Sequence, residues 1–113
     1  MKPKLDVRAR DISRKILGLY DGDQNRWTRG ALARIEDRRR TYVDDESATC
    51  WCLVGAAHRV YKDDYVAMDH WRCGMEKIMG SSVYSWNDTP GRNFDDVMSV
   101  LQDHILSKRS KDT

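Results

Sequence analysis

The sequence predicts a mostly helical α+β fold, with about four helices around one core and a small β-hairpin between the first and second helices. Apolar residues recur at helical spacing in several segments, alternate with polar ones in a single short segment, and are separated by turn-forming residues. The 113 residues suffice for one hydrophobic core. We therefore expect one domain over residues 1–113, with residues 1–4 and 108–113 frayed.

The first predicted helix occupies the N-terminal segment. Its apolar stripe repeats every three or four residues and consists of Leu5, Ala9, Ile12, Ile16 and Leu19. Asp21-Gly22-Asp23 ends the helix, and Gly22 suits a left-handed cap because it lacks a Cβ. This pattern is typical of an amphipathic helix with one face on the core.

A hairpin is predicted next, between residues 27 and 43. Apolar residues alternate from Ala31 to Ile35, which is typical of a strand. Glu36-Asp37 interrupts the alternation with a charged turn, and Thr41 and Val43 resume it. Because an isolated two-stranded hairpin is barely stable, we expect it to pack on the helices.

The second predicted helix begins at Asp44 or Asp45, since aspartate is a favoured N-cap and acidic residues suit the first turn. Its expected buried face is Cys50, Leu53, Val54, Ala57, Val60 and Tyr61. The third helix begins at Asp63 or Asp64 and ends at Gly80. Its apolar face is Tyr65, Met68, Trp71, Met75, Ile78 and Met79.

The last helix follows a polar segment. Residues 83–86 are expected to be extended and to lead into a loop that ends at Arg92. Asn93 then caps the last helix, with Asp96 at the third position as a shortened capping-box partner. Its apolar face is Phe94, Val97, Met98, Leu101, His104 and Ile105.

Composition restricts the environment of the chain. With 40% hydrophobic and 34% charged residues, no apolar run approaches the roughly 20 residues of a membrane span. The N-terminus lacks the apolar stretch of a secretory signal, so we expect a cytoplasmic protein with no membrane partner. Three cysteines argue against a secreted disulfide scaffold and favour reduced thiols.

The cysteines and histidines do not predict a metal or a catalytic centre. Cys50 and Cys52 are expected on one helix, where residues two apart point in nearly opposite directions. His58, His70 and Cys73 lack the spacing of a known zinc site. With Cys52 inside a helix rather than at its start, nothing lowers the pKa of its thiol. We therefore expect no cofactor, no metal and no catalytic residue.

The charge is local rather than global. The net charge is only +2, but the segment from Arg26 to Arg40 contains six arginines with Trp27 and Tyr42 at its ends. Guanidinium groups beside aromatic rings suit phosphate contacts and base stacking. This segment is one candidate nucleic-acid surface; the alternative is a solvated hairpin whose long side chains cover apolar surface.

The strongest candidate site is the polar segment that begins at Trp86. Asn87 and Asp88 can organise a turn, and Arg92 precedes a helix N-terminus, which favours an anionic ligand. Trp27 and Arg29 add a second aromatic ring and a second cation. The alternative is structural: Trp86 fills the core, and Asp88 pairs with Arg92.

Three tryptophan motifs carry a resemblance. Trp27-Thr28-Arg29-Gly30-Ala31, Trp51-Cys52-Leu53-Val54-Gly55-Ala56, and Trp86-Asn87-Asp88 followed by Gly91-Arg92 resemble an uncharacterised family of small domains. The resemblance runs from about Trp27 to Ile105 and implies a compact single domain of bacteriophages and bacteria, notably actinobacteria. The family has no established activity, so the resemblance assigns no catalytic residue.

These observations predict stoichiometric binding rather than catalysis. In a phage setting, the chain would counteract a bacterial defence system by capturing a nucleotide-type signal, stacked on tryptophan and bonded to arginine, Asn87 and Asp88. A second possibility is an inhibitor that binds a defence protein such as a CRISPR effector, with Trp27, Trp71 or Trp86 as its anchor. A third is nucleic-acid binding through residues 26–40.

Overall fold

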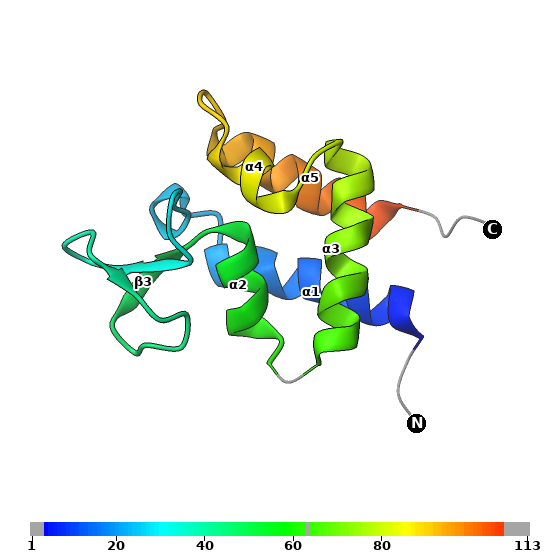
Figure 1. Cartoon of the computed structure of the whole chain (residues 1–113), viewed down its shortest axis with the longest axis horizontal. Coiled ribbons are helices and arrows are strands. Elements are labelled where there is room, and N and C mark those ends of the chain that lie inside the picture. Colours follow the sequence, from blue (N-terminus) through cyan, green and yellow to red (C-terminus); the bar gives the residue numbers. More distant parts are fainter. Residues whose placement is uncertain (1–3, 63, 108–113) are drawn as a thin grey trace.

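Helix α1 (Leu5–Tyr20) lies at the centre of the helices in the computed structural model, which describes residues 4–62 and 64–107 (Figure 1). It packs against three other helices: α2 (Leu53–Val60), α3 (Tyr65–Met79) and α5 (Phe94–Leu106). The short helix α4 (Val83–Asp88) packs on α2 and α3. Within the described residues, five helices and one small sheet confirm the mostly helical α+β class, with one helix more than predicted.

The N-terminal helix follows its predicted stripe. Ala9, Ile12 and Ile16 are buried, together with Ser13 and Tyr20. The helix ends in two left-handed residues, of which Asp21 is the cap with φ of 50° and Gly22 follows with φ of 70°. The expected left-handed turn is therefore present, with Asp21 as the capping residue. The predicted fraying of residues 1–4 and 108–113 lies outside the described residues, apart from Lys4.

The sheet lies at one end of the helices and contains the predicted hairpin (Figure 1). Strand β1 (Ala33–Ile35) pairs antiparallel with β2 (Arg40–Thr41), and Ala33 faces Thr41 across this pair. A third strand, β3 (Ala48–Trp51), pairs with the other side of β1, so the strand order is β2-β1-β3. On the outer side of β3, Trp27 forms a parallel bridge with Trp51.

The predicted start of the second helix at Asp44 or Asp45 is wrong. Residues 48–51 form β3, and α2 begins eight residues later than Asp45, at Leu53, with Cys52 as its N-cap. Asp45 instead accepts hydrogen bonds from the Thr41 hydroxyl and from Ser47 N and shapes the turn before β3. Burial of Ala48 and Cys50 around exposed Thr49 is the alternation of a strand, and β3 pairs with β1.

The first turn of α2 lies directly against the backbone of the segment that enters β1. Leu32 O accepts a hydrogen bond from Cys52 N at 3.2 Å. A Cβ on Gly55 would lie 1.9 Å from that same Leu32 oxygen, inside any allowed contact. Only glycine fits at position 55, because α2 lies so close to the backbone that enters β1. This contact explains why a helix contains a glycine here.

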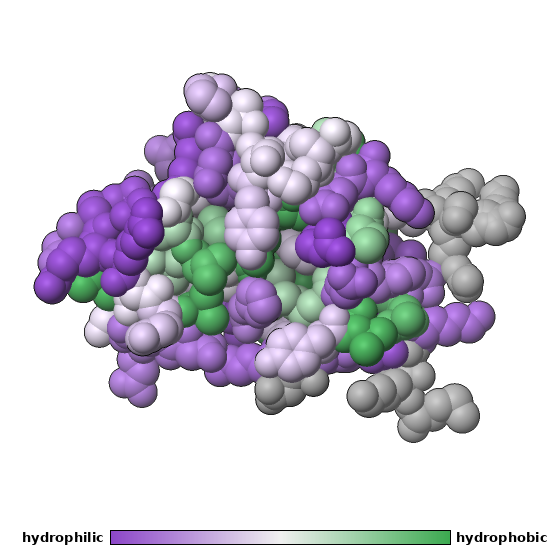
Figure 2. Space-filling view, viewed as in Figure 1, coloured by the Kyte–Doolittle hydropathy of each residue, from purple (hydrophilic) through white to green (hydrophobic). Residues whose placement is uncertain are grey.

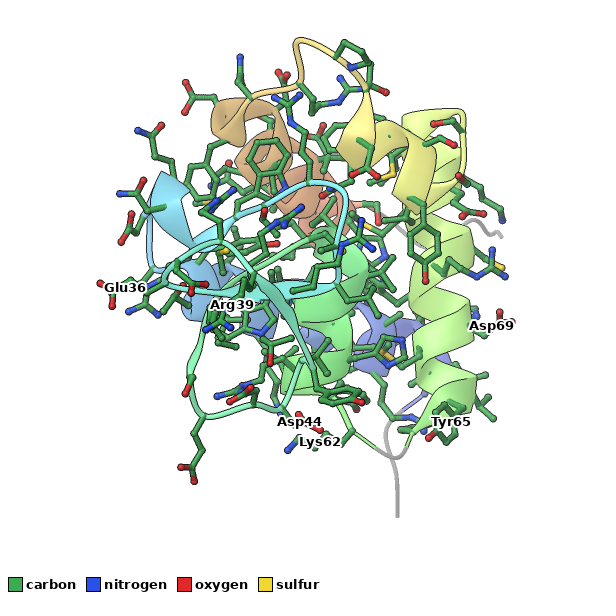
Figure 3. All side chains as sticks on the ribbon, turned by 60° about the vertical axis from the view of Figure 1, so that its left-hand side comes forward. Glu36, Arg39, Asp44, Lys62, Tyr65 and Asp69 are labelled. Atoms are coloured by element: carbon green, nitrogen blue, oxygen red, sulfur yellow. The ribbon has the colours of Figure 1, made fainter. Side chains whose placement is uncertain are left out.

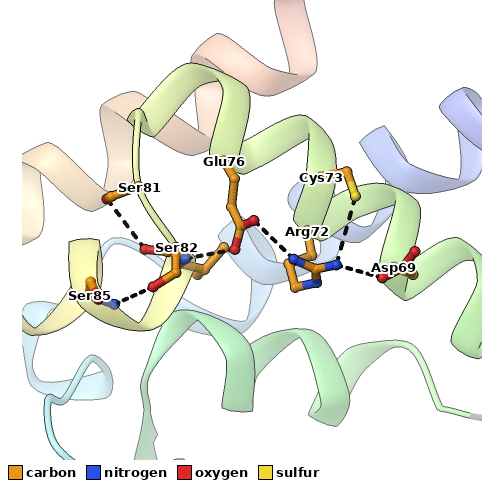
Figure 4. A network of polar contacts seen from close by, with 8 residues as sticks. Asp69, Arg72, Cys73, Glu76, Ser81, Ser82 and Ser85 are labelled. Atoms are coloured by element: carbon orange, nitrogen blue, oxygen red, sulfur yellow. Dashed lines mark hydrogen bonds and ion pairs between the residues drawn. The ribbon is translucent and has the colours of Figure 1, made fainter.

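Polar side chains determine where α4 begins (Figure 4). Arg72 holds Glu76 at 2.9 Å, and the second Glu76 oxygen accepts a hydrogen bond from Val83 N at 3.1 Å. Ser82 is the N-cap of α4 and accepts from Ser85 N. The predicted extended piece over residues 83–86 is therefore wrong, because these side chains satisfy N–H groups of a helical first turn.

Helix ends elsewhere match the prediction. Asp64 caps α3 through Ala67 N, and Gly80 ends it with φ of 77°, whereas Asp63 lies outside the described residues. Asn93 and Asp96 form the expected capping box at the start of α5. In the part of the chain that the structure describes, we find no helix with the length and apolarity that crossing a bilayer requires.

The contact at Gly55 predicts a severe effect of one methyl group. Gly55→Ala should lower the free energy of unfolding by at least about 2–3 kcal/mol, because the new Cβ overlaps the Leu32 carbonyl and forces α2 away from the sheet. The measurement is urea denaturation followed by circular dichroism.

Gly18→Ala is the matched control. Gly18 is an exposed residue within α1 with no atom near its would-be Cβ, so alanine there should raise stability by up to about 1 kcal/mol. Equal destabilisation by both substitutions would contradict a specific contact between Gly55 and Leu32.

Candidate functional site

Asn87 connects three segments that are distant in the sequence. Its side chain is buried, with 1% of its surface exposed. Its Oδ1 accepts from Trp27 Nε1 at 2.8 Å and from Leu53 N at 3.1 Å. Its Nδ2 donates to Thr28 O at 3.1 Å and to Asp88 Oδ1 at 2.9 Å. One amide thus joins α4 to the loop before β1 and to the first N–H of α2.

The structure brings the six predicted site residues into one cluster. Trp86, Asn87 and Asp88 lie on α4, not in a loop. Arg29 donates a hydrogen bond to the carbonyl oxygen of Arg92, which joins the loop before β1 to the loop before α5. Trp27 belongs to the cluster through its bond to Asn87.

The tryptophan rings of this cluster are covered by its own arginines. The Arg92 guanidinium lies 3.9 Å from the centroid of the buried Trp86 ring, and its Nε donates to Trp86 O. Arg29 lies over the half-buried Trp27 ring at 5.3 Å. Among the described residues, Arg92 forms an ion pair with Asp96, at 4.0 Å. Trp86 therefore fills the core, as the structural alternative expects, but no Asp88–Arg92 ion pair accompanies it in the described residues.

Beside this cluster lies a groove that we call the tyrosine groove. Its volume is about 470 Å³, and it lies between the sheet, α2 and α4. Figure 2 shows apolar side chains exposed in a hollow of this face. Its rim carries two exposed aromatic rings, Tyr42 with 85% and Tyr84 with 54% of the surface accessible. The other lining residues are Gly30, Ala31, Leu32, Arg40, Thr41, Cys52, Val54, Asn87 and Asp88.

Asp88 is the acidic group of the tyrosine groove and is exposed. Its Oδ1 accepts from Gly30 N at 3.1 Å and from the Asn87 amide. Among the hydrogen bonds and ion pairs of the described residues, its second oxygen, Oδ2, has no partner. The bonds to Oδ1 therefore orient the carboxylate, and Oδ2 can accept a hydrogen bond from a ligand in the groove.

Most arginines of residues 26–40 bind the chain itself. Arg34 donates to Thr28 Oγ1 and to the carbonyl oxygens of Arg29 and Arg38. Arg26 and Arg39 are also engaged, with Leu19 O and with Asp37. Arg38 contacts Thr28 Oγ1 and Cys50 Sγ, and Arg29 contacts Arg92 O. Within the part of the chain that is described, Arg40 makes no hydrogen bond or ion pair, and it lines the tyrosine groove.

Cys52 lines the same groove, but its thiol is not activated. The expectation that it lies within a helix is wrong, because it is the N-cap of α2 and its Sγ accepts from Gly55 N at 3.3 Å. Burial, only partly opposed by that N–H, raises the pKa of the Cys52 thiol, and the negative charge of Asp88 raises it further. The thiol is therefore protonated at neutral pH, which removes the nucleophilic form.

A buried polar network that sequence reasoning missed lies between α1, α3 and α5. Trp71 Nε1 donates to Ser13 Oγ at 3.0 Å, and Ser13 Oγ lies 2.7 Å from His104 Nδ1. Burial, together with the charges of Arg10 and His70, lowers the pKa of His104 to about 4. Ser13 is fully buried and unreachable by a substrate, so the pair is not a nucleophile with its base. A serine on the apolar stripe of α1 is the signal that points to it.

No group of three histidine, cysteine or acidic side chains within residues 4–62 and 64–107 converges on a point that could hold a metal ion. His70 and Cys73, considered above as ligands, both lie on α3. The cysteines of the described chain are free thiols, with Cys50 and Cys52 buried and Cys73 exposed.

Comparison with known proteins supplies a family. The model of a family of unknown function (DUF6197) matches residues 23–105. This match confirms the resemblance to an uncharacterised family, whereas the tryptophan motifs as its signature and its phage and actinobacterial distribution stay predictions. No curated protein and no solved structure matches the chain significantly.

The buried amide of Asn87 predicts a large loss of stability on truncation. Asn87→Ala leaves Trp27 Nε1, Leu53 N and Thr28 O without their partner in the interior. Buried polar groups without partners cost about 1–3 kcal/mol each, so we expect a loss of about 2–4 kcal/mol, measured by urea denaturation. Asn25→Ala, at an exposed position, should change stability by less than about 0.5 kcal/mol. Similar values for the two variants would refute the central role of Asn87.

His104 predicts a loss of stability in mild acid. Its pKa is lowered from 6.5 to about 4, so between these values the unfolded chain binds a proton that the folded chain does not. Stability from this group is therefore complete above pH 6.5 and falls as the pH drops to about 4, by about 3 kcal/mol at most. His104→Gln should flatten the pH dependence of the unfolding free energy in that window, whereas His70→Gln should change it much less, because the charge of His70 is the smallest of the causes that lower the His104 pKa. A His104→Gln profile parallel to wild type would exclude this role.

Proposed function

We propose that this chain, which belongs to the DUF6197 family of unknown function, is a binding protein whose tyrosine groove takes a planar, nucleotide-type ligand. One observation carries the proposal. Two exposed tyrosines, an unengaged arginine and a half-satisfied carboxylate line one apolar groove. Small-molecule sites are mostly apolar clefts of roughly 300–1,000 Å³ with a few directed polar groups, and this groove fits that description.

The aromatic rim suits a flat ring system. Tyr42 and Tyr84 leave large parts of their rings exposed to solvent, where a flat ligand could stack on them. A nucleobase stacked on such a ring gains about 1–3 kcal/mol. The buried lining residues Cys52 and Val54 form an apolar floor, which would shield the ring edge from water.

The charged groups suit the two ends of a nucleotide. The guanidinium of Arg40 matches a phosphate in charge and geometry. Asp88 Oδ2 can accept from an amino or ring N–H of a base, while its Oδ1 stays bonded to Gly30 N. Because Asp88 repels phosphate, the base would lie at the α4 side of the groove and the phosphate towards β2, which carries Arg40.

In this proposal the residues first expected to touch the ligand divide into two roles. Asn87 and Asp88 line the groove. Trp27, Trp86, Arg29 and Arg92 hold them in place, because the arginines already cover the tryptophan faces. The stacking surface is thus supplied by tyrosine rather than by tryptophan.

The biological role that we propose is capture of a nucleotide signal of a bacterial defence system by a phage protein in the host cytoplasm. Its support is the resemblance to a family of phage and actinobacterial domains. Stoichiometric capture rather than turnover is favoured because the one thiol in the groove, Cys52, has a raised pKa.

A protein partner is the second candidate, since Tyr42, Tyr84 and Leu32 together expose an aromatic and aliphatic patch. Tyrosine and arginine dominate binding hot spots. Two of the anchors considered from sequence are buried, Trp71 and Trp86, so the tyrosines would replace them. Nucleic-acid binding through residues 26–40 is less favoured, because five of their six guanidinium groups are bonded to the chain itself.

Calorimetric titration with adenine and guanine mononucleotides and with cyclic dinucleotides tests the proposal. At least one of them should bind, and Arg40→Ala and Tyr84→Ala should each weaken that binding about tenfold, the effect of one lost charge-assisted bond or one lost stacking contact. Unfolding curves of the variants should match wild type because both side chains are peripheral.

Matched controls come from Arg39→Ala and Tyr65→Ala. Figure 3 shows Arg39 at the hairpin and Tyr65 at the start of α3, and neither lines the groove. These variants should bind like wild type. Absence of binding to every nucleotide, or equal weakening by the control variants, would overturn the proposal. If no nucleotide binds, the second candidate is supported by a pull-down from a bacterial host in which one protein is captured stoichiometrically and in which Tyr84→Ala abolishes the capture.

A further inference from the structure

We propose that a second cavity, between α1, α3 and α5, binds a phosphate group. Its volume is about 620 Å³, and the residues that line it are separate from those of the tyrosine groove. It is independent of the function proposed above, because the two cavities are lined by different residues from different helices.

Cationic groups dominate this cavity. Lys4, Arg10 and Lys77 line it, against the single carboxylate of Asp6. Arg10 lies 3.5 Å from Asp6 in an ion pair, which leaves an excess of two positive charges with the imidazoles neutral. An anion is therefore the ligand that the electrostatics favours.

The buried imidazole of His104 aims a donor into the cavity. Trp71 Nε1 can only donate, so Ser13 Oγ is its acceptor and has one hydrogen left to give. That hydrogen has a choice between His104 Nδ1 at 2.7 Å and Met75 Sδ at 3.9 Å, and the nearer nitrogen is the stronger acceptor. Nδ1 is then unprotonated, which places the ring proton on Nε2.

No hydrogen-bond partner of Nε2 is present in the described part of the chain, although only 5% of the His104 surface is exposed. Gly74 keeps this atom accessible from the cavity. A Cβ at position 74 would lie 3.0 Å from Nε2 and would cover it. A buried N–H group without a hydrogen-bond partner costs free energy. A ligand oxygen next to His104 Nε2 would therefore gain a favourable hydrogen bond from this N–H.

These observations together favour a phosphate over other ligands. A phosphate dianion offers several acceptor oxygens, enough for Nε2–H and the flanking Lys77 and Arg10. A metal ion is disfavoured by the excess of positive charge around His70 and Cys73, which also line the cavity. Apolar side chains of Leu5, Ala9 and Ile78 leave room for the organic part of a phosphomonoester.

The test is titration of the full chain with inorganic phosphate at pH 7, at constant ionic strength with chloride as the reference anion. Long-range ¹H–¹⁵N NMR should show His104 protonated at Nε2 before phosphate is added and its Nε2 resonance shifted by phosphate. Lys77→Glu should weaken the binding at least about tenfold, since it replaces a charge-assisted contact with a repulsive one.

Lys15→Glu is the charge-matched control, because Lys15 is exposed on α1 and does not line the cavity. It should leave phosphate affinity within about twofold. No shift of His104 by phosphate, or equal weakening by Lys15→Glu and Lys77→Glu, would overturn the proposal. Both variants change surface lysines, so an unfolding curve suffices to show that they fold.

A parallel titration with glycerol phosphate identifies the source of the phosphate group. Tighter binding than inorganic phosphate assigns the cavity to an organic phosphomonoester that uses the apolar wall, and equal binding assigns it to free phosphate. Gly74→Ala should abolish the response of His104 to either probe, because its methyl group covers Nε2. A response that survives Gly74→Ala in the folded variant would contradict Nε2 as the donor.

Discussion

The buried amide of Asn87 is the interaction on which the arrangement of the groove depends. A primary amide has two donors and two acceptor lone pairs, and Asn87 uses them on Trp27, Leu53, Thr28 and Asp88. No aliphatic residue of that size could satisfy these groups. The same bonds fix the position of α4 relative to α2 and to the loop before β1, and they orient the Asp88 carboxylate, so the fold and the candidate site share one determinant.

The second constraint is the contact between Gly55 and Leu32. It allows the N-terminal turn of α2 to lie against the backbone that enters β1, so that Cys52 and Val54 form the floor of the tyrosine groove. A larger residue at position 55 would push α2 away from the segment that enters β1, and this would separate the walls of the groove. The groove is thus a product of backbone proximity, not of an insertion or a long loop.

The sequence predicts local features of this fold better than long-range ones. The stripe of α1, the hairpin, and the capping box at Asn93 and Asp96 depend on neighbours within a few residues, and all are present. Strand β3 was missed because Cys50 also continues the helical spacing of Leu53, Val54 and Ala57, and pairing with β1 is not visible locally. The extended state of residues 83–86 was wrong because Glu76, seven residues before Val83, satisfies its N–H.

The site shows the same limit. The fold brings residues of the tryptophan motifs together, since Trp27, Asn87 and Arg92 belong to one cluster. The sequence could not show that the arginines cover the tryptophans, because that contact joins residues brought together by the fold. Tyr42, Tyr84 and Arg40 carry no motif, and only their exposure around a shared groove distinguishes them.

The sheet has a further consequence for partners. Its outer strand β2 has two residues and follows Arg38 and Arg39, while the Trp27–Trp51 bridge and the bond from Thr28 N to Trp51 O occupy the free side of β3. Exposed strand edges are templates for the addition of another chain, and a short charged strand and a covered edge both discourage it. We therefore expect aggregation and peptide docking by strand addition to be disfavoured at both edges of the sheet. Recognition of a partner would then depend on side chains instead of backbone pairing.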